Sequence, residues 1–329
     1  MNQDLAVLII AHRRFDSLKR ILQACAKNDV RKIYIFVDGV DVNASGAVAE
    51  QERIFQLIKS FEKLFKGELY LAVHSKNHGC AASVLSACSW IFTFEDKAII
   101  LEDDCEPTLD FFNFCQSSFE VIEKNKEIWL ACGTQFVPAN YFDSSWCLSK
   151  YALIWGWATT KTKWIEIEHS LRHFMPSKNS QISTVENSYW NAGGRRAVEG
   201  WVDVWDTILV QQMIRLNRFA ILPNAPLVTN TGGDKYATHT SAKSKGLYLK
   251  TGSFRLSALK PRLIIDCENW LRSEWYGIAP RHWISTKITW LIDHVINRKP
   301  PYAPLTIRWD LAITDRRDGL NTLKGTHKN

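Results

Sequence analysis

Three acidic residues that could hold a cation follow a short apolar run in the first third of the chain. Glu102, Asp103 and Asp104 come directly after AIIL (98–101), a run typical of a buried strand. Carboxylate oxygens are the ligands that Mg²⁺ and Mn²⁺ prefer, and such an ion can bridge a diphosphate. The same acids could instead open a loop and cap a helix near residue 108. Three acids in a row at a strand end favour the metal site.

Two further polar groups follow apolar runs near the N-terminus. Asp38 comes after IFV, and Asp-Gly after a strand either makes a turn or accepts hydrogen bonds from a nucleobase or ribose. The segment HRR (12–14) follows LAVLIIA, where it is either a solvated basic loop or a contact to phosphate or base. The chain contains neither GxGxxG nor GxxxxGK[ST], which argues against a dinucleotide-binding Rossmann loop and a P-loop.

A pair of aspartates lies in the segment WVDVWDTILVQQMI. Asp203 and Asp206 are three residues apart at the predicted start of a helix that runs to about Leu216. We expect one of them to cap the helix. The other could act as a general base, flanked by indole rings that hold a sugar and exclude water.

Two loops carry additional candidates. His239 lies in TGGDKYATHT (231–240), and beside a carboxylate site it becomes a candidate metal ligand. Arg195 and Arg196 follow two glycines, where they either form a solvated loop, which we favour, or clamp a phosphate or an acidic acceptor.

Apolar runs and segments with helical spacing alternate through the first 135 residues. Strands are expected at 5–11, 32–39, 68–74, 97–104 and 128–133. A first helix, capped by Asp16 or Ser17, places Leu18, Ile21 and Cys25 on one face. This alternation predicts βαβ units and a mainly parallel, doubly wound sheet. Ligands bind beyond the carboxyl ends of such strands, so the polar groups described above should meet at one rim.

Composition is typical of a globular protein. The chain has 329 residues, of which 46% are hydrophobic, and a net charge of +7 that is compatible with nucleic acid, anionic lipid or phosphorylated substrates. Its eight cysteines form no CxxC pair, so we expect neither a zinc ribbon nor a disulfide framework, and a reducing cytosol fits best. No apolar stretch is as long as a membrane span, and no secretory signal is present, which predicts a soluble protein.

The second half of the chain is less regular. Residues 136–250 hold short elements punctuated by Gly, Trp and Asn, whereas 260–299 form a Trp-rich, basic helical stretch broken at Gly277 and Pro280. We favour helices packed on the catalytic domain, and the alternative is docking on an anionic bilayer. The expected division is a catalytic domain at 1–250, with halves 1–135 and 136–250, and a helical extension at 251–329.

Taken together, these segments resemble nucleotide-sugar glycosyltransferases of the GT-A fold. LEDD (101–104) resembles their DxD-type motif. The segments WGWAT (155–159), WD (205–206) and ATHT (237–240) are similar to bacterial family-2-like transferases. LEDD and WD are also similar to the N-acetylglucosaminyltransferase I type. The resemblance covers about residues 5–240. Two departures are EDD in place of a strict DxD and WATT in place of WATW.

The resemblance implies a role for each matching residue. Asp206 would be the catalytic base, and Asp104 and His239 would ligate Mn²⁺ or Mg²⁺. The implied donor-binding residues are Ala11, His12, Arg14, Asp38, Glu102, Asp103 and Gly156. Trp155, Trp157, Trp201 and Trp205 would shape the sugar sites.

The activity implied is a metal-dependent, inverting transfer from a nucleotide sugar, most readily a UDP-sugar, to a glycan or lipid-linked acceptor. The expected setting is bacterial surface-polysaccharide synthesis in the cytoplasm or at the inner face of the membrane, with no nucleic-acid partner. The alternatives are a non-catalytic sugar-nucleotide-binding relative and a sugar-nucleotide pyrophosphorylase. The pyrophosphorylase usually has a GxGTR-type loop, and this chain has AHRRFD at that place. A haloacid-type phosphatase fits FVDGVD less well, because its second Asp comes one residue too late.

Overall fold

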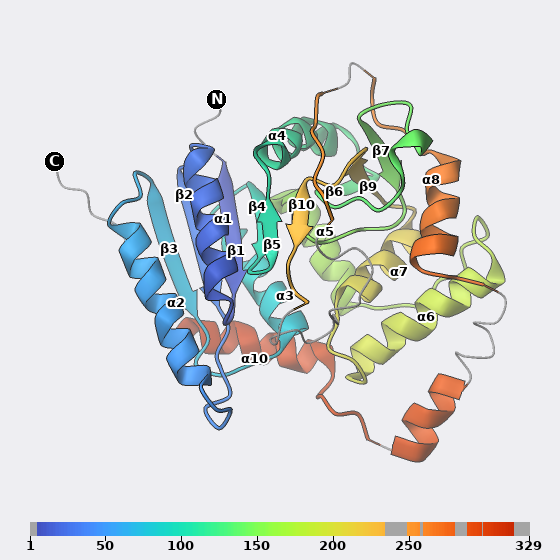
Figure 1. Cartoon of the computed structure of the whole chain (residues 1–329). Helices are drawn as coiled ribbons and strands as arrows, with labels where there is room; N and C mark the ends of the chain where they lie inside the picture. Colours follow the sequence, from blue (N-terminus) through green and yellow to red (C-terminus); the bar gives the residue numbers. More distant parts are fainter. Residues whose placement is uncertain (1–4, 234–248, 257–258, 280–287, 298, 319–329) are drawn as a thin grey trace.

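A computed structural model describes residues 5–233, 249–256, 259–279, 288–297 and 299–318 (Figure 1). Its main sheet has eight strands in the order β3-β2-β1-β4-β8-β6-β9-β7. The strands are β1 (Ala6–Ala11), β2 (Lys32–Val37), β3 (Glu68–Val73), β4 (Lys97–Glu102), β6 (Ile128–Cys132), β7 (Trp146–Ser149), β8 (Trp157–Thr160) and β9 (Phe219–Pro223). A second, two-stranded sheet pairs β5 (Cys105–Pro107) with β10 (Val228–Asn230).

Strand directions agree with the expected mainly parallel sheet. β1 pairs in parallel with β2 and β4, β2 with β3, and β6 with β9. β8 runs antiparallel between β4 and β6, and β7 is antiparallel at the edge. The chain leaves β1 for β2 and β3 on one side and returns to β4 on the other, so a topological switch point lies between β1 and β4. The prediction of a GT-A-like α/β fold is confirmed.

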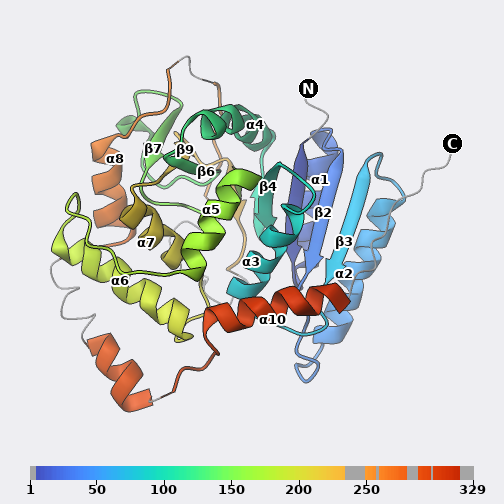
Figure 2. The ribbon, with the colours of Figure 1, turned by 180° about the vertical axis from the view of Figure 1, so that it is seen from behind.

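Helices cover both faces of the sheet (Figures 1 and 2). One face carries α1 (Phe15–Lys27), α2 (Ala47–Glu62) and α4 (Leu109–Lys124). The other carries α3 (Cys80–Ile91), α5 (Lys161–Arg172), α7 (Asp206–Leu216) and α10 (Leu305–Asp318), with α6 (Thr184–Glu199) packed on α7. Alternate residues of β1 enter the two cores, as the pleat of a strand requires: Val7 and Ile9 face one, Leu8 and Ile10 the other.

The expected cap of α1 by Asp16 or Ser17 is wrong, and so is the alternative in which Glu102, Asp103 or Asp104 caps α4. α1 begins at Phe15 after Arg14, with no side-chain cap, and Asp16 lies in its first turn. The Ser17 hydroxyl is instead 3.1 Å from Glu106. Thr108 accepts the capping hydrogen bond of α4, so the acids before it do not cap that helix. β4 ends at Glu102, two residues earlier than expected.

The chain after residue 250 returns to the sheet. α8 (Ile265–Trp270) continues into a π-helical turn (Leu271–Trp275), and a further π-helical turn covers Ile292–Asn297. α10 then packs against α3 and α6, in front in the view of Figure 2, with Trp309 only 1% exposed. The expectation of packed helices concerns 260–299, and it holds for α8 and the turn after it, because Cys267 and Leu271 lie in the core. Trp283 lies outside the described residues.

The cysteines and the helix lengths bear on two further expectations. All eight cysteines are free thiols, and seven of them are buried, which agrees with the expected lack of a disulfide framework. Within the part of the chain that the structure describes, every helix is too short or too polar to cross a bilayer.

Candidate active site

The loop after β1 is bonded to the acids that follow β4. The backbone N–H of His12 donates to Asp103 Oδ2 at 2.8 Å. The Arg14 guanidinium lies 2.9 Å from Asp103 Oδ1 and 3.3 Å from Asp104 Oδ2. Both loops leave the carboxyl ends of neighbouring parallel strands, at the switch point of the sheet. The predicted meeting of these polar groups at one rim is confirmed.

Asp103 is the acid that organises this rim. It is 3% exposed and accepts hydrogen bonds from the backbone N–H groups of His12 and Arg14 as well as from the Arg14 side chain. A buried carboxylate with this many donors is fully committed to protein contacts. Asp103 therefore shapes the loop after β1.

Asp104 has a more open environment. Its Oδ1 accepts from the Cys105 thiol at 3.2 Å and lies 3.4 Å from the Asn230 amide nitrogen. Its Oδ2 faces Gly232, where a Cβ would come within 2.2 Å of this oxygen. Any larger residue at 232 would displace the carboxylate. The glycine after β10 therefore makes room for the Asp104 carboxylate.

Glu102 carries the most perturbed carboxyl of the cluster. Burial raises its pKa to about 8, and the nearby charges of Asp104 and Asp103 act in the same direction. Arg14 opposes this effect, and Asp206 adds to it from the other half of the chain. The site is therefore an accumulation of negative charge that a cation would relieve.

The carboxylates present fit a divalent cation in kind. Glu102 and Asp104 offer oxygen atoms, and the pKa of Glu102 is raised first by burial and then by the charges of Asp104 and Asp103. Among the described residues, no group of three or more His, Cys, Asp or Glu side chains is arranged to hold a metal ion. The third predicted ligand, His239, lies outside the described residues. A metal at this place stays a prediction.

His12 places an unsatisfied nitrogen at the same rim. Burial lowers the pKa of its imidazole, although the charges of Asp38 and Asp103 act against this, so the ring is neutral at neutral pH. Within the described chain, Nε2 is buried and has no hydrogen-bond partner. The Ala11 carbonyl accepts from the N–H of Asp38 at 3.1 Å. A ligand bound here could satisfy the orphaned nitrogen.

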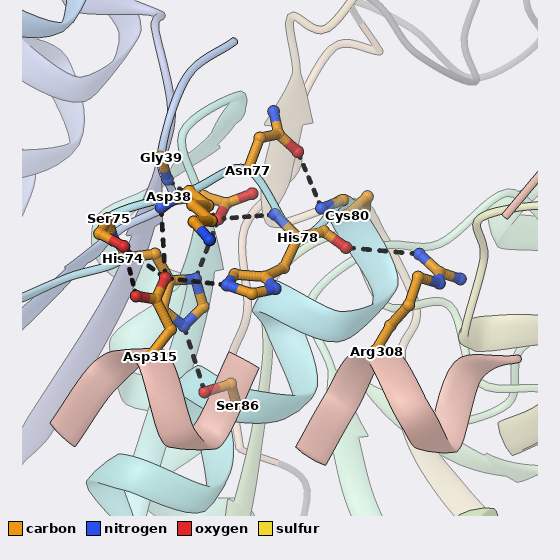
Figure 3. A network of polar contacts seen from close by, with 12 residues as sticks. Asp38, Gly39, His74, Ser75, Asn77, His78, Cys80, Ser86, Arg308 and Asp315 are labelled. Atoms are coloured by element: carbon orange, nitrogen blue, oxygen red, sulfur yellow. Dashed lines mark hydrogen bonds and ion pairs between the residues drawn. The ribbon is translucent and has the colours of Figure 1, made fainter. Parts of the chain in front are cut away.

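Asp38 lies at the centre of a hydrogen-bond network (Figure 3). Its Oδ1 accepts from the N–H of Gly39 at 3.0 Å, lies 2.9 Å from His74 Nδ1, and accepts a longer bond from the N–H of His78. A Cβ on Gly39 would lie 2.3 Å from the carbonyl carbon of Lys76, which explains the glycine by close backbone packing. A contact of Asp38 to a base or ribose stays a prediction.

α10 supports the same loop from the far end of the sequence (Figure 3). The Asp315 carboxylate accepts from the N–H groups of Ser75 at 3.0 Å and Lys76 at 3.2 Å, and it lies 2.8 Å from His78 Nε2. Asp38 and Asp315 thus hold the loop between β3 and α3 from two sides. No sequence pattern indicates this role of Asp315, because it lies 240 residues from Ser75.

Asp203 caps a helix, but a different one from that expected. It is 5% exposed, and its carboxylate accepts from the N–H groups of Cys80 at 2.7 Å and Ala81 at 3.3 Å, at the start of α3. Arg308 of α10 pairs with the same carboxylate. Both carboxylate oxygens of Asp203 are occupied by these contacts, so Asp206 is the candidate base of the pair.

Asp206 is the first residue of α7, and its Oδ1 accepts from the N–H of Thr207 at 2.8 Å. Burial raises the pKa values of Tyr189 and Tyr276, and the charge of Asp206 raises both further. The same charge raises the pKa of Glu102. Asp206 therefore lies within electrostatic reach of the acidic rim and of two phenol rings.

A cavity of about 1090 Å³ opens beside Asp206. It lies between α6, the start of α7, Tyr276 and residues 289–294, and its lining mixes aromatic rings with polar side chains. Residues 289–294, called the C-terminal segment below, thus contribute one wall of the cavity. The sequence predicted Asp206 at a sugar site but gave no indication that Tyr189, Tyr276 and Trp290 surround it.

The expectation for the four tryptophans needs correction. Trp157 and Trp205 are 1% and 2% exposed, and their rings pack together with centroids 5.6 Å apart between β8 and α7. Trp155 packs edge-on against Phe136 at 5.4 Å. Trp201 is 9% exposed and lies outside the cavity lining. Trp157 and Trp205 therefore fill the core, since large apolar rings gain most from burial, whereas Trp155 is half-buried and its role at a sugar site stays a prediction.

Packing alone explains Gly156. Its φ of +72° lies in the left-handed region, and a Cβ there would be 2.8 Å from Val228 Cγ2 and 3.3 Å from Leu101 Cδ2. The residue is buried, and its carbonyl accepts from the N–H of Gly133 at 2.7 Å. Its predicted role beside the donor is untested.

Arg195 and Arg196 lie on helix α6, so the expectation of a solvated loop is wrong. Gly193 allows this helix to approach α7, because a Cβ there would lie 2.6 Å from Thr207 Cγ2. Arg196 Nε is 2.6 Å from Asp293 Oδ2. Arg195 is exposed at the cavity and forms no ion pair with any described residue.

Comparison with known proteins assigns the chain to no family. No family model matches the chain, and no curated protein gives a significant match. A UDP-glucose pyrophosphorylase complexed with UDP-glucose aligns at 9% identity over 66% of this chain and 89% of its own, with a TM-score of 0.33. The apo-form glycosyltransferase GlyE of Streptococcus pneumoniae TIGR4 aligns at 15% identity over 54% of this chain and 40% of its own, with a TM-score of 0.30. Likenesses this weak carry no functional conclusion.

Proposed function

We propose that this chain is a metal-dependent, inverting glycosyltransferase that moves a sugar from a nucleotide-sugar donor to a glycan or lipid-linked acceptor. One observation carries the proposal. The acidic rim at Glu102 and Asp104, placed at the switch point of the sheet, lies within electrostatic reach of Asp206, which lines a large cavity. In this proposal the rim is the donor site, the cavity is the acceptor site, and Asp206 lies where the two meet.

The donor would lie across the rim. Asp38 and the Nε2 of His12, which has no hydrogen-bond partner among the described residues, follow the ends of β2 and β1, where they could bind base or ribose. The diphosphate would lie toward Asp104 and Arg14. We propose a UDP-sugar as the first donor to test.

Glu102 and Asp104 would hold Mn²⁺ or Mg²⁺, with His239 as a third ligand. The ion would supply positive charge that stabilises the diphosphate as it leaves. Arg14 bridges Asp103 and Asp104, so it already lies at the acids that would bind the ion.

Asp206 would act as general base. The acceptor hydroxyl oxygen forms a bond to the anomeric carbon while the bond from that carbon to the diphosphate oxygen breaks. The leaving diphosphate takes the electron pair, and Asp206 takes the hydroxyl proton. Attack from the face opposite the leaving group inverts the anomeric centre.

The test is a screen of UDP-, GDP-, CMP- and dTDP-sugars for hydrolysis and transfer, with and without Mn²⁺. We expect one donor class to react only with the metal. Asp206→Asn should reduce transfer by about 100- to 10,000-fold while the donor Kd changes less than threefold. Asp310→Asn, whose side chain is 67% exposed, is the control.

Other outcomes point elsewhere. Near-wild-type transfer by Asp206→Asn would exclude it as the base. Donor binding without turnover would favour the non-catalytic relative. Formation of a sugar 1-phosphate and a nucleoside triphosphate from the donor and pyrophosphate would favour the pyrophosphorylase.

We also propose peripheral contact with the inner face of a bacterial cytoplasmic membrane, in surface-polysaccharide synthesis. The segment 288–296 exposes several apolar side chains, which would enter the interface. They are Ile288 (53%), Ile292 (41%) and Ile296 (66%), none of which lines the cavity. Flotation with vesicles containing anionic lipid should capture the protein at low salt, and failure to bind would refute membrane contact.

A further inference from the structure

The cavity beside Asp206 is closed on one side by the C-terminal segment 289–294. Asp293 of this segment is 3% exposed and pairs with Arg196 of α6. His294 Nε2 lies 3.4 Å from Glu199 Oε2, also on α6. The wall is thus held to α6 by the ion pair of Asp293 with Arg196 and by the contact of His294 with Glu199.

Aromatic side chains face this cavity at both ends. Trp290 stands at the outer end, where its ring stacks on His294 with centroids 5.0 Å apart and planes 16° apart. Tyr189 and Tyr276 lie at the inner end, within reach of the Asp206 charge. A sugar ring has an apolar C–H face and a hydroxyl edge, so aromatic faces with flanking polar groups match it at both ends.

The size of the cavity exceeds what one sugar ring needs. At about 1090 Å³ it lies at the upper limit of ordinary small-molecule sites, which hold ligands of several rings in about 300–1,000 Å³. Arg195 adds hydrogen-bond donors to the lining and has no ion-pair partner among the described residues.

We infer that this cavity is an acceptor site for a saccharide of at least two rings, with its attacking hydroxyl at Asp206 and a more distant ring stacked on Trp290. The inference rests on the proposed function for the role of Asp206. It assigns the C-terminal segment to acceptor binding, and Trp290 is the residue that selects acceptor length.

Two substitutions test the stacking ring. Trp290→Ala removes it, Trp290→Phe keeps an aromatic face, and Ile296→Ala is a control on the same segment, because Ile296 is 66% exposed and lies outside the cavity lining. The probes are the mono-, di- and trisaccharides of the cello-, malto-, xylo- and chito-series. Calorimetric titration measures their binding in the presence of UDP and Mn²⁺.

We expect at least one trisaccharide to bind about tenfold more tightly than its monosaccharide. Trp290→Ala should remove this advantage, Trp290→Phe should restore it to within threefold, and Ile296→Ala should leave it unchanged. Equal affinity of Trp290→Ala and wild type, or no gain with chain length, would overturn the inference. So would the absence of binding by every trisaccharide.

Donor hydrolysis separates this inference from the proposed function. Hydrolysis in the absence of acceptor reports on the donor site and on Asp206, whereas calorimetric titration with saccharides reports on the cavity that Trp290 lines. If the wild type hydrolyses no donor but binds trisaccharides through Trp290, the proposed enzyme fails and the saccharide site stands. If donor hydrolysis is normal and Trp290 has no effect on saccharide binding, the saccharide site fails and the proposed enzyme stands.

Discussion

The acidic rim and the cavity beside it are held together by different forces. At the rim, Asp103 and Asp38 each accept several hydrogen bonds, and their donors come from distant parts of the chain. Around the cavity, the walls are formed by aromatic rings, by the ion pair of Arg196 with Asp293, and by the contact of Glu199 with His294.

The difference follows from what each region would bind. A nucleoside diphosphate has fixed polar groups, and a hydrogen-bond network can place carboxylates to match them. A saccharide varies in length and linkage, so broad aromatic faces can accept it with few directional contacts. Variants in the two regions should therefore fail in different ways: rim variants should lose stability or donor binding, and cavity variants should lose acceptor binding alone.

Asp103 gives the largest expected effect. Asp103→Asn breaks a buried ion pair with Arg14 and weakens the bond from the N–H of His12, so the free energy of unfolding should fall by about 3–5 kcal/mol. Urea denaturation measures this change. The matched variant Asp104→Asn should cost less than about 1 kcal/mol but should abolish metal-dependent donor binding. Similar stability losses in both variants would show that the two acids share one role.

Glu268 should make stability depend on pH. It lies on α8, is 4% exposed, and accepts a hydrogen bond from the N–H of Lys150. Burial raises the pKa of Glu268 from 4.5 to about 7. The stability that its protonated form provides is therefore complete below about pH 4.5 and is lost as the pH rises through 7.

Glu268→Gln should remove this loss. The variant should gain stability relative to wild type between pH 5 and pH 8, approaching about 3 kcal/mol at the alkaline end. Urea denaturation at several pH values measures the difference. A constant difference across this range would mean that Glu268 titrates normally.

Asp315 tests whether α10 supports the rim. Asp315→Asn weakens the hydrogen bonds to Ser75, Lys76 and His78, so the loop that holds Asp38 should become less ordered. We expect the donor KM to rise about five- to tenfold, equivalent to about 1 kcal/mol, while kcat stays within twofold. Asp310→Asn on the same helix should change neither. A fall in kcat at constant KM would instead point to an effect on Asp206.

The sheet and the rim could be predicted because their signals are local. Each apolar run of β1, β2 and β4 is followed by its polar residues, and the rules of parallel sheets place these ends together. The helices α5, α6 and α10 were missed. α6 contains Gly193 and Gly194, poor helix formers that are there because α7 and Phe174 pack against them.

The roles within the site depend on long-range contacts that no pattern reveals. Asp203 and Asp206 look alike in the sequence, yet Asp203 caps α3, which begins 123 residues earlier. Trp157 and Trp205 resemble sugar-binding rings but fill the core, whereas Trp290 stays half-exposed at the cavity. Only the three-dimensional structure distinguishes a ring buried in the core from one exposed for ligand binding.

The smallest expected effect on stability is that of Trp290→Ala. Because its ring is 51% exposed and stacks on His294 at the surface, its removal should change the free energy of unfolding by less than about 0.5 kcal/mol. Trp205→Ala, which removes a ring that is 2% exposed, should cost about 3–5 kcal/mol. Thermal and urea denaturation compare the two. A large loss for Trp290→Ala would mean that the ring supports the fold of the C-terminal segment, and that the cavity wall needs it for more than ligand binding.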